Sequence, residues 1–174
     1  MGCRLDVQHR QVSSSPVVSR PEQRADAAGL LLFRLDAQRC AIPAAAVVEI
    51  LSAVATSPLP RQPSYVAGVI DVRGSVMPVL DLRVRFGHAG RPLELADQFI
   101  VVRAGARLFA LWVDQVEGFA ASDAVAFSPA AGLIVQDRSL AGVTSVADGL
   151  ANIYDLDAFV AECEADAVFE TSAA

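Results

Sequence analysis

Short apolar segments separated by turn residues make up most of the chain from residue 30 onward. The first segment, LLLFRL, is followed by Asp36-Ala37-Gln38 and then by RCAI, which predicts a β-hairpin. A short helical turn is expected next, at residues 43–46. Further segments bounded by Gly, Pro or Asp predict strands at residues 47–51, 68–72, 76–80, 98–103, 107–113, 115–119, 141–146 and 150–154. The pattern therefore predicts a mainly β protein.

A helical period replaces the strand pattern near the C-terminus. Leu156, Phe159, Val160 and Cys163 recur at i, i+3, i+4 and i+7, which places them on one face of a helix over residues 155–164. Asp155 is the expected N-cap, and the acidic residues after it are expected on the solvated side. We therefore expect a packed C-terminal helix with Cys163 in the core, followed by an acidic tail at residues 165–174.

The chain contains an internal duplication. Residues 67–82 (AGVIDVRGSVMPVLDL) match residues 141–156 (AGVTSVADGLANIYDL) at six of sixteen positions without a gap. A weaker match at nearly the same offset pairs residues 30–47 with residues 99–116, and both copies run strand, turn, strand. The sequence therefore predicts two copies of one small β unit.

Each copy holds about five strands, and a unit of that size closes or nearly closes into a barrel because open edges promote aggregation. We expect two small barrels side by side, over roughly residues 30–97 and 98–154, with an exchange of elements between them left open. Met77-Pro78 removes one ladder donor from its strand, so this stretch is expected at an edge or a bulge.

Composition agrees with a folded domain and excludes several classes of function. The 174 residues are 53% apolar and 20% charged, and Arg, Asp, Glu, Pro or Gly interrupts every run that approaches the length of a membrane span. Residues 1–29 follow neither the strand nor the helix period and are expected to be a disordered tail. The net charge of -6 comes mostly from residues 155–174, and aromatic residues are only 6%, so no nucleic-acid groove is predicted.

The three cysteines, Cys3, Cys40 and Cys163, are widely spaced and form no CxxC pair, so the sequence predicts neither a metal site nor a disulfide framework. The N-terminus lacks the apolar region of a secretory signal. We therefore expect reduced thiols, a cytoplasmic location and no insertion into a membrane.

Catalytic motifs are also missing, since the sequence has no GxSxG, Walker or GxGxxG pattern. His88 is expected to be a solvated loop residue, and Asp71 and Asp81, which flank one predicted hairpin, are more typical of a turn former and a helix cap. Trp112 and Cys40 lie in apolar segments and are expected in the core. The sequence predicts no catalytic residue and no cofactor.

Arg73 is an exception, because the two copies differ at this turn. The first copy reads Val72-Arg73-Gly74-Ser75, and the second has Ala147 in the position of the arginine. The fold therefore does not require Arg73, which leaves three interpretations: a solvated turn residue, a contact to a partner, or an internal pair with a carboxylate such as Glu49 or Asp71.

The same segments resemble a known family. VVEIL (residues 47–51) and YVAGVIDVRGSVMPVLDLRVRFG (residues 65–87) are similar to the signature of CheW-like domains, in which a strand ending in Glu-Ile is followed by G-V-x-N-L-R-G-x-I-x-P-V-x-D-L. Asp71-Val72 stands where that family usually has Asn-Leu. The second half, residues 98–119 and 140–160, is similar to the family's second barrel and terminal helix, so the resemblance covers about residues 30–163.

This resemblance implies two tandem SH3-like five-stranded β-barrels with a C-terminal α-helix. It also implies a non-catalytic adaptor that couples the cytoplasmic tip of a chemoreceptor to the regulatory domain of a CheA-type histidine kinase, in chemotaxis or a related pathway. Its partner contacts would fall on Val47, Glu49, Gly68, Val69, Val72 and Arg73. Self-association through barrel edges remains open, as does the alternative of a small ligand-binding or homo-oligomeric regulatory barrel.

Overall fold

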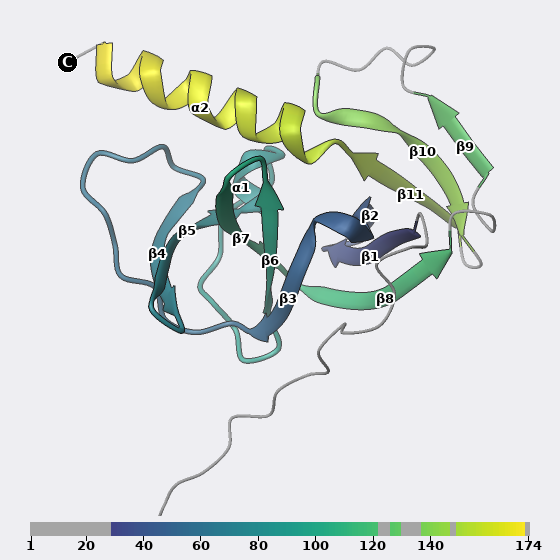
Figure 1. Ribbon diagram of the computed structural model, residues 1–174, viewed down its shortest axis with the longest axis horizontal. Coiled ribbons are helices and arrows are strands. Elements are labelled where there is room, and N and C mark those ends of the chain that lie inside the picture. The colour runs from purple at the N-terminus through teal and green to yellow at the C-terminus, as the bar shows by residue number, and fades with distance from the viewer. Residues whose placement is uncertain (1–28, 122–125, 130–136, 147–148, 173–174) are drawn as a thin grey trace, which may run out of the picture.

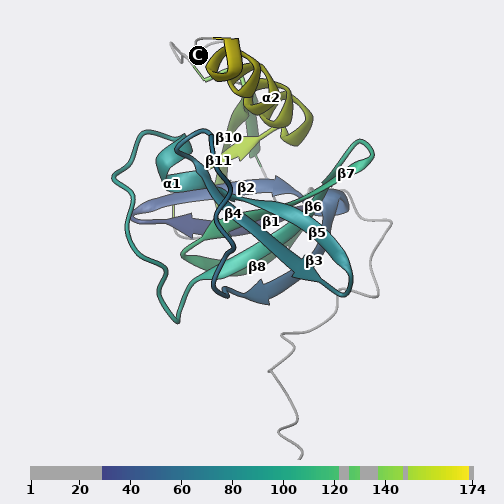
Figure 2. The same ribbon diagram turned by 90° about the vertical axis from the view of Figure 1, so that its left-hand side faces the viewer.

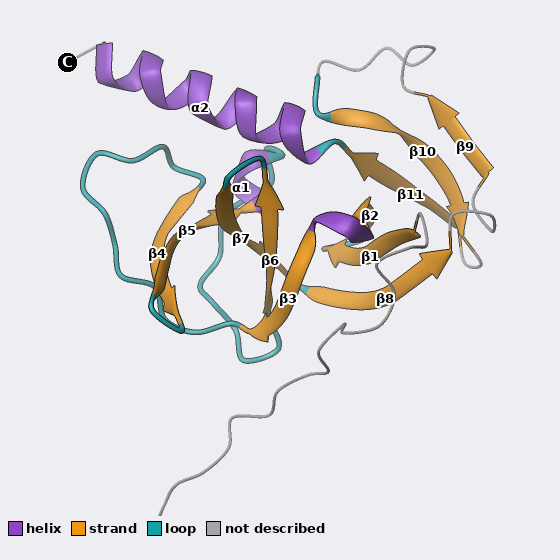
Figure 3. Cartoon of the chain, viewed as in Figure 1, coloured by secondary structure: helices purple, strands orange, loops and turns teal. Residues whose placement is uncertain are grey.

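The computed structural model describes residues 29–121, 126–129, 137–146 and 149–172, which form two β-sheets and a long C-terminal helix (Figure 1). The expected tail lies outside these residues, except that Gly29 is the first residue of strand β1 (Gly29–Leu35). The predicted mainly β architecture with a C-terminal helix is confirmed (Figure 3). None of the described helices combines the length and the apolar character that a membrane crossing needs.

The first sheet has five strands in the order β3-β6-β7-β5-β4. Its edges are β3 (Val47–Ser52) and β4 (Val66–Val72), and its inner strands are β5 (Ser75–Asp81), β6 (Gln98–Ala104) and β7 (Arg107–Val113). Neighbouring strands are antiparallel except for β5 and β7, which are parallel. Ser57 exchanges two backbone hydrogen bonds with Val69 and so covers part of the outer edge of β4.

The second sheet has six strands in the order β8-β1-β2-β11-β10-β9. It combines β1 and β2 (Gln38–Pro43) with β8 (Gln115–Ala121), β9 (Ala126–Pro129), β10 (Leu140–Val146) and β11 (Gly149–Tyr154). The parallel pair here is β11 with β2. Each sheet therefore takes strands from both halves of the chain.

The duplication seen in the sequence is also present in the strand pairing. Val79 of β5 lies opposite Ala110 of β7, and the equivalent Ile153 of β11 lies opposite the equivalent Ala41 of β2. Hairpins β4–β5 and β10–β11 each carry a register shift at the same place, next to Gly68 and next to Gly142. The two copies therefore have the same local fold.

Each copy also ends in a capped helix. Asp81 Oδ1 accepts hydrogen bonds from the amides of Arg83 and Val84 at the start of α1 (Leu82–Arg85), and Asp155 Oδ1 accepts from the amides of Asp157 and Ala158 at the start of α2 (Leu156–Ser172). The predicted N-cap at Asp155 is confirmed.

The larger hydrophobic core joins the two sheets and α2. It includes Phe33 from β1, Ile100 from β6, Leu111 from β7, and Phe159 and Cys163 from α2. A smaller core lies within the five-stranded sheet and contains Ile70, Met77, Val79, Phe99, Val101 and Ala110. Helix α2 leaves the end of β11 and lies along one side of the body, which Figure 2 shows from a second direction.

Three details differ from the sequence-based expectations. Helix α2 continues to Ser172, beyond the predicted end at residue 164, because residues 165–172 contain neither Gly nor Pro. Helix α1 and strand β9 were too short to stand out from the pattern. The stretch Met77-Pro78 belongs to β5, which is an inner strand, but the pairing of β5 with β7 begins only at Val79, so the missing amide of Pro78 costs no ladder bond there.

Candidate partner-binding site

The turn between β4 and β5 has the geometry of a tight two-residue hairpin. Val72 pairs with Ser75, and the two residues between them have positive φ, 53° at Arg73 and 83° at Gly74. Asp71 Oδ1 accepts a hydrogen bond of 2.7 Å from the amide of Gly74, so Asp71 is a turn former. Two positive φ values define a turn in which Asn or Gly is favoured at the first position, so Arg73 occupies a backbone conformation that suits other residues better.

Arg73 forms an ion pair with Glu49. Its Nη2 lies 3.2 Å from Glu49 Oε2, and the exposed fractions of the two side chains are 63% and 18%. Glu49 belongs to β3, at the opposite edge of the sheet from β4, so the sheet curls until its two edges approach each other. The internal pair that the sequence left open is thus present, and most of the arginine side chain still faces solvent.

Val47 and Gly68, two of the other residues predicted to contact a partner, pack against other parts of the chain. Val47 is half-buried and packs against the larger core. Gly68 is buried with φ of 134°, and a Cβ atom placed on it would lie 2.4 Å from the backbone oxygen of Ser57. Gly68 therefore permits the close approach of the Ser57 segment to β4.

The other two predicted residues lie on opposite faces of β4. Val72 packs against the smaller core, whereas Val69 is half-buried and pairs with Pro78 across the hairpin. Val76, which pairs with Asp71, is 69% exposed and was missed by the sequence analysis. The alternation of β5 could have identified Val76, because the buried Met77 next to it must face the other way.

The groups considered for chemistry have structural partners. Asp71 and Asp81 hold a turn and a helix cap, and burial raises the pKa of Asp81, an effect that its hydrogen bonds from Val84 and Arg83 oppose. Cys40 and Cys163 are free and buried, and burial raises the pKa of the Cys40 thiol to about 12. His88 Nδ1 lies 3.6 Å from Asp36 Oδ2. Among the described residues, no group of three His, Cys, Asp or Glu side chains is arranged to hold a metal ion.

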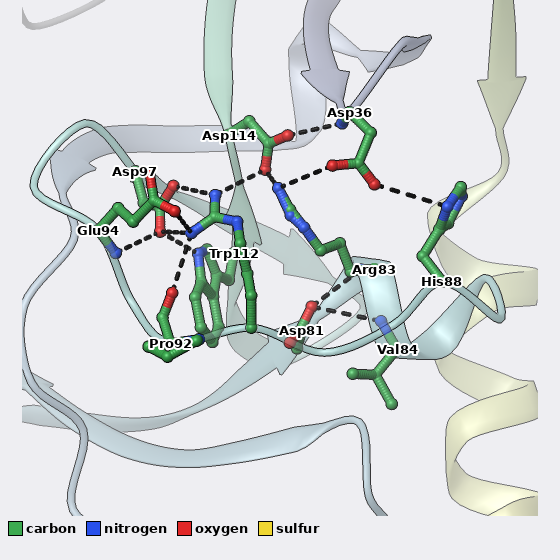
Figure 4. A network of polar contacts seen from close by, with 11 residues as sticks. Asp36, Asp81, Arg83, Val84, His88, Pro92, Glu94, Asp97, Trp112 and Asp114 are labelled. Carbon is green, nitrogen blue, oxygen red and sulfur yellow. Dashed lines mark hydrogen bonds and ion pairs between the residues drawn. The ribbon is translucent and has the colours of Figure 1, made fainter.

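A network of charged residues lies between the sheets and was not predicted (Figure 4). At one end, Arg91 donates to Asp97 through both terminal nitrogens, at 2.8 and 2.5 Å, and Asp97 also accepts from Trp112 Nε1 at 3.0 Å and from the amide of Glu94 at 2.8 Å. Burial alone would raise the pKa of Asp97, but these hydrogen bonds and the charge of Arg91 hold it below its usual value. Trp112 is therefore partly buried with a polar contact, rather than a purely apolar core residue.

The other end of the network is centred on Asp114. Its carboxylate contacts the buried guanidinium of Arg83, lies 3.2 Å from Arg91 Nη2 and accepts a hydrogen bond of 2.6 Å from the amide of Asp36. The sequence held one signal for this network, since Asp97 and Asp114 directly flank the segment 98–113, in which the charged residues are Arg103 and Arg107 at and near the central turn.

Comparison with known proteins assigns the fold to a family. Residues 29–164 match the CheW-like domain. The chain belongs to this family. The match ends before α2 does, so the last part of that helix extends beyond the CheW-like domain.

Curated relatives are CheW proteins and similar proteins. The chemotaxis protein CheW of Rhizobium meliloti is 34% identical over 50% of this chain and 56% of its own length. Protein FrzA of Myxococcus xanthus is 44% identical over 41% of each chain. The matched part of this chain thus spans about half the length of these relatives.

A solved structure shares the fold. The crystal structure of the scaffolding protein TtCheW from Thermoanaerobacter tengcongensis superposes with a TM-score of 0.66 at 22% identity, covering 75% of this chain and 90% of that one. This confirms the predicted fold of the CheW-like domain.

Proposed function

We propose that the chain is a non-catalytic adaptor that couples chemoreceptors of the methyl-accepting type to a CheA-type histidine kinase in a chemosensory pathway. Its partners would be the regulatory domain of the kinase and the cytoplasmic tip of the receptor, and its place of action the cytoplasm, at receptor arrays. Membership of the CheW-like family supports this proposal, as does the naming of its relatives as chemotaxis proteins.

The observation that carries the proposal is the backbone conformation of Arg73, together with its exposed side chain. An arginine held at φ of 53° in a hairpin that favours Asn or Gly is a local conflict between sequence and backbone. Residues held in such conformations cluster at functional sites, but Arg61 has nearly the same φ, so the conformation alone does not mark a binding residue. Glu49 orients the guanidinium while 63% of the side chain remains exposed, which leaves its planar donors available to a carboxylate or carbonyl of a partner.

The proposed docking surface therefore centres on Glu49 and Arg73. Val76 adds an exposed aliphatic side chain on the same hairpin, next to the turn. Val47 and Val72 pack against the larger and the smaller core, and Gly68 permits the approach of Ser57, whereas Val69 lies on the opposite face of β4 from Val72. The ligand-binding alternative gains no support from an apolar cavity lined by Phe33, Phe86 and Phe159, because it has room for no more than about one water molecule.

A single substitution tests the proposal. Arg73→Asn removes the guanidinium but suits the turn, so we expect an unchanged or higher melting temperature. Binding to the kinase regulatory domain or to the receptor tip should weaken by about tenfold or more, which is about 1.4 kcal/mol and typical of a central interface residue. Isothermal titration calorimetry with each partner measures the change.

Arg61→Asn is the matched control, because Arg61 is also exposed and has φ of 55°. This variant should bind both partners like the wild type. If Arg73→Asn bound both partners with unchanged affinity, Arg73 would be a solvated turn residue and the proposed docking surface would be wrong.

A further inference from the structure

The chain crosses from the five-stranded to the six-stranded sheet through a single residue. Strand β7 ends at Val113 and β8 begins at Gln115, so Asp114 alone connects them. The earlier crossover, from β2 to β3, uses the three-residue 3-10 helix η1 (Ala44–Ala46). Because a one-residue connection has few backbone dihedral angles, the conformation of Asp114 directly affects the angle between the sheets.

Asp114 is held from both sheets at once. From the six-stranded sheet, the amide of Asp36 in the β1–β2 turn donates to Asp114 Oδ2 at 2.6 Å, and the carbonyl of Arg34 accepts from the amide of Asp114 at 3.1 Å. From the other side, Arg83 of α1 and Arg91 contact Asp114 Oδ1. The carboxylate therefore bridges the two sheets (Figure 4).

Arg83 is the buried member of this bridge, with only 4% of its side chain exposed. It contacts Asp114 and lies 3.7 Å from Asp36 Oδ1, so one guanidinium reaches both a residue of the crossover and a turn of the six-stranded sheet. Arg83 is the second residue after the end of β5, and Asp81 Oδ1 accepts a hydrogen bond of 2.9 Å from its amide. The end of β5, in the five-stranded sheet, therefore fixes the position of Arg83.

The hydrophobic effect does not fix such an angle by itself. The core shared by the sheets is apolar, and the attraction between apolar surfaces has no preferred direction. Charge-assisted hydrogen bonds are directional, and a buried ion pair adds little net stability while it disfavours arrangements that would leave its charges unpaired. A network of this kind is suited to select one arrangement of two packed sheets.

We propose that Arg83 and Asp114 are positioning residues that fix the orientation of the two sheets. This inference rests on the proposed function in one respect: with one partner docked at Glu49 and Arg73 and the second on the six-stranded sheet, the angle between the sheets sets the distance between the two partners. Loosening the bridge would leave each surface intact but lower the effective concentration of one partner near the other.

The first experiment measures the orientation directly. Spin labels at Val76→Cys in β5 and Leu150→Cys in β11 report a distance between the sheets, in a Cys3→Ser background, because these two positions are 69% and 66% exposed and Cys40 and Cys163 are buried. The double variant Arg83→Met/Asp114→Asn removes the opposite charges together, so neither is left unpaired by the other. We expect its distance distribution to become broader or to shift.

Arg107→Gln/Glu164→Gln is the matched control, since it removes an exposed ion pair between β7 and α2. Its distance distribution should equal that of the unsubstituted pair. If the double variant does not fold, Arg83→Lys decides the matter: it keeps the charge but loses the planar fork, and it should broaden the distribution to a smaller extent. An unchanged distribution in the folded double variant, or in Arg83→Lys when it alone folds, would overturn the proposal.

The second experiment tests the link to function. We expect the double variant to bind the kinase regulatory domain and the receptor tip singly within threefold of the wild type, and to form the ternary complex at least tenfold more weakly. A broadened distance distribution with an unchanged ternary complex would overturn this link. Failure of the wild type to bind either partner would instead contradict the proposed function, and the spin-label distances would still test the bridge.

Discussion

Gly68 and Arg73, both in the β4–β5 hairpin, have different physical roles within one predicted surface. Gly68 is buried and faces the backbone of Ser57, whereas Arg73 is exposed and faces the side chain of Glu49. A substitution at Gly68 therefore acts on the fold first, and a substitution at Arg73 acts on the surface.

Gly68→Ala should destabilise the protein more than an alanine at Gly118. Both glycines have nearly the same φ, 134° and 132°, but a Cβ at Gly118 meets no atom within 4 Å. Gly118→Ala should thus cost about 1–3 kcal/mol from backbone strain alone. Gly68→Ala should cost a further 1–3 kcal/mol or so from the clash with Ser57. Urea unfolding of both variants measures the difference, and equal costs would mean that the Ser57 segment moves aside freely.

Asp97 and Asp81 should affect acid stability with opposite signs. The pKa of Asp97 is held below its usual value, so the stability it contributes is complete at neutral pH and is lost as the pH falls from about 4 through the folded-state pKa. Asp97→Asn should therefore destabilise the protein at pH 7, and its difference from the wild type should shrink in acid.

Asp81 is the internal comparison, because its pKa is raised by burial. Its ionised form is disfavoured in the folded state, so the wild type gains stability relative to Asp81→Asn as the pH falls through the folded-state pKa of Asp81. Free energies of unfolding in urea at several pH values between 7 and 3 measure both differences. Parallel slopes for the two variants would contradict the assigned causes.

At the scale of the elements, α2 closes the larger core. Phe159 is buried and lies edge-on to Phe86, which stacks on Tyr154 at a centroid distance of 4.5 Å. The hydroxyl of Tyr65 also donates to the carbonyl of Cys163 at 3.0 Å. Aromatic packing, this hydrogen bond and ion pairs such as Arg85 with Glu162 thus hold the helix in place.

Phe159→Ala should lower the free energy of unfolding by about 3–5 kcal/mol, because it leaves a cavity where the helix meets the sheets. Phe159→Leu keeps most of the volume and should cost clearly less. Thermal and urea unfolding measure both. A cost below about 1 kcal/mol for the alanine variant would show that α2 is peripheral to the core.

The sequence predicted these elements well where apolar residues follow a clear period. The helical spacing of Leu156, Phe159 and Val160 identified the packed face of α2, and the duplicated segments identified the two equivalent hairpins. The turn at Arg73 could be located for the same reason, since the repeat aligns it with Ala147.

The rest depends on contacts between distant parts of the chain. The ion pair of Arg73 with Glu49 requires the two sheet edges to meet, and strand periodicity does not reveal which edges meet. The bridge of Arg83 and Asp114 joins residues from α1 and from a crossover between sheets, and each residue alone resembles an ordinary charged loop residue. Pairing order, rather than local pattern, determines both sites.

For the whole molecule, the exchange of strands makes the two halves of the chain interdependent. Residues 29–97 supply β3, β4 and β5 but lack β6 and β7, which lie between β3 and β5 in the same sheet. Residues 98–172 in turn lack β1 and β2, which separate β8 from β11. Neither half contains a complete sheet.

Each half expressed alone should therefore show no cooperative unfolding transition, and the two together should recover the native fold. Amide proton spectra of the separate and mixed halves provide the measurement. A half that gave a dispersed spectrum alone would show that its strands pair in a different order from the one in the intact chain.

The single-residue crossover at Asp114 also separates two stages in the synthesis of the chain, before and after the five-stranded sheet is complete. All strands of the five-stranded sheet, and with them Glu49 and Arg73, have been made once the ribosome passes Val113. Strand β2 pairs with β11, which starts at Gly149, so at ~5–20 residues per second β2 waits roughly 5 to 20 s for this neighbour. In the last part of that interval, after Val113 has been made, the nascent protein carries a complete docking sheet beside a β1–β2 hairpin whose apolar side chains, such as Leu31 and Phe33, have not yet received α2 as their cover.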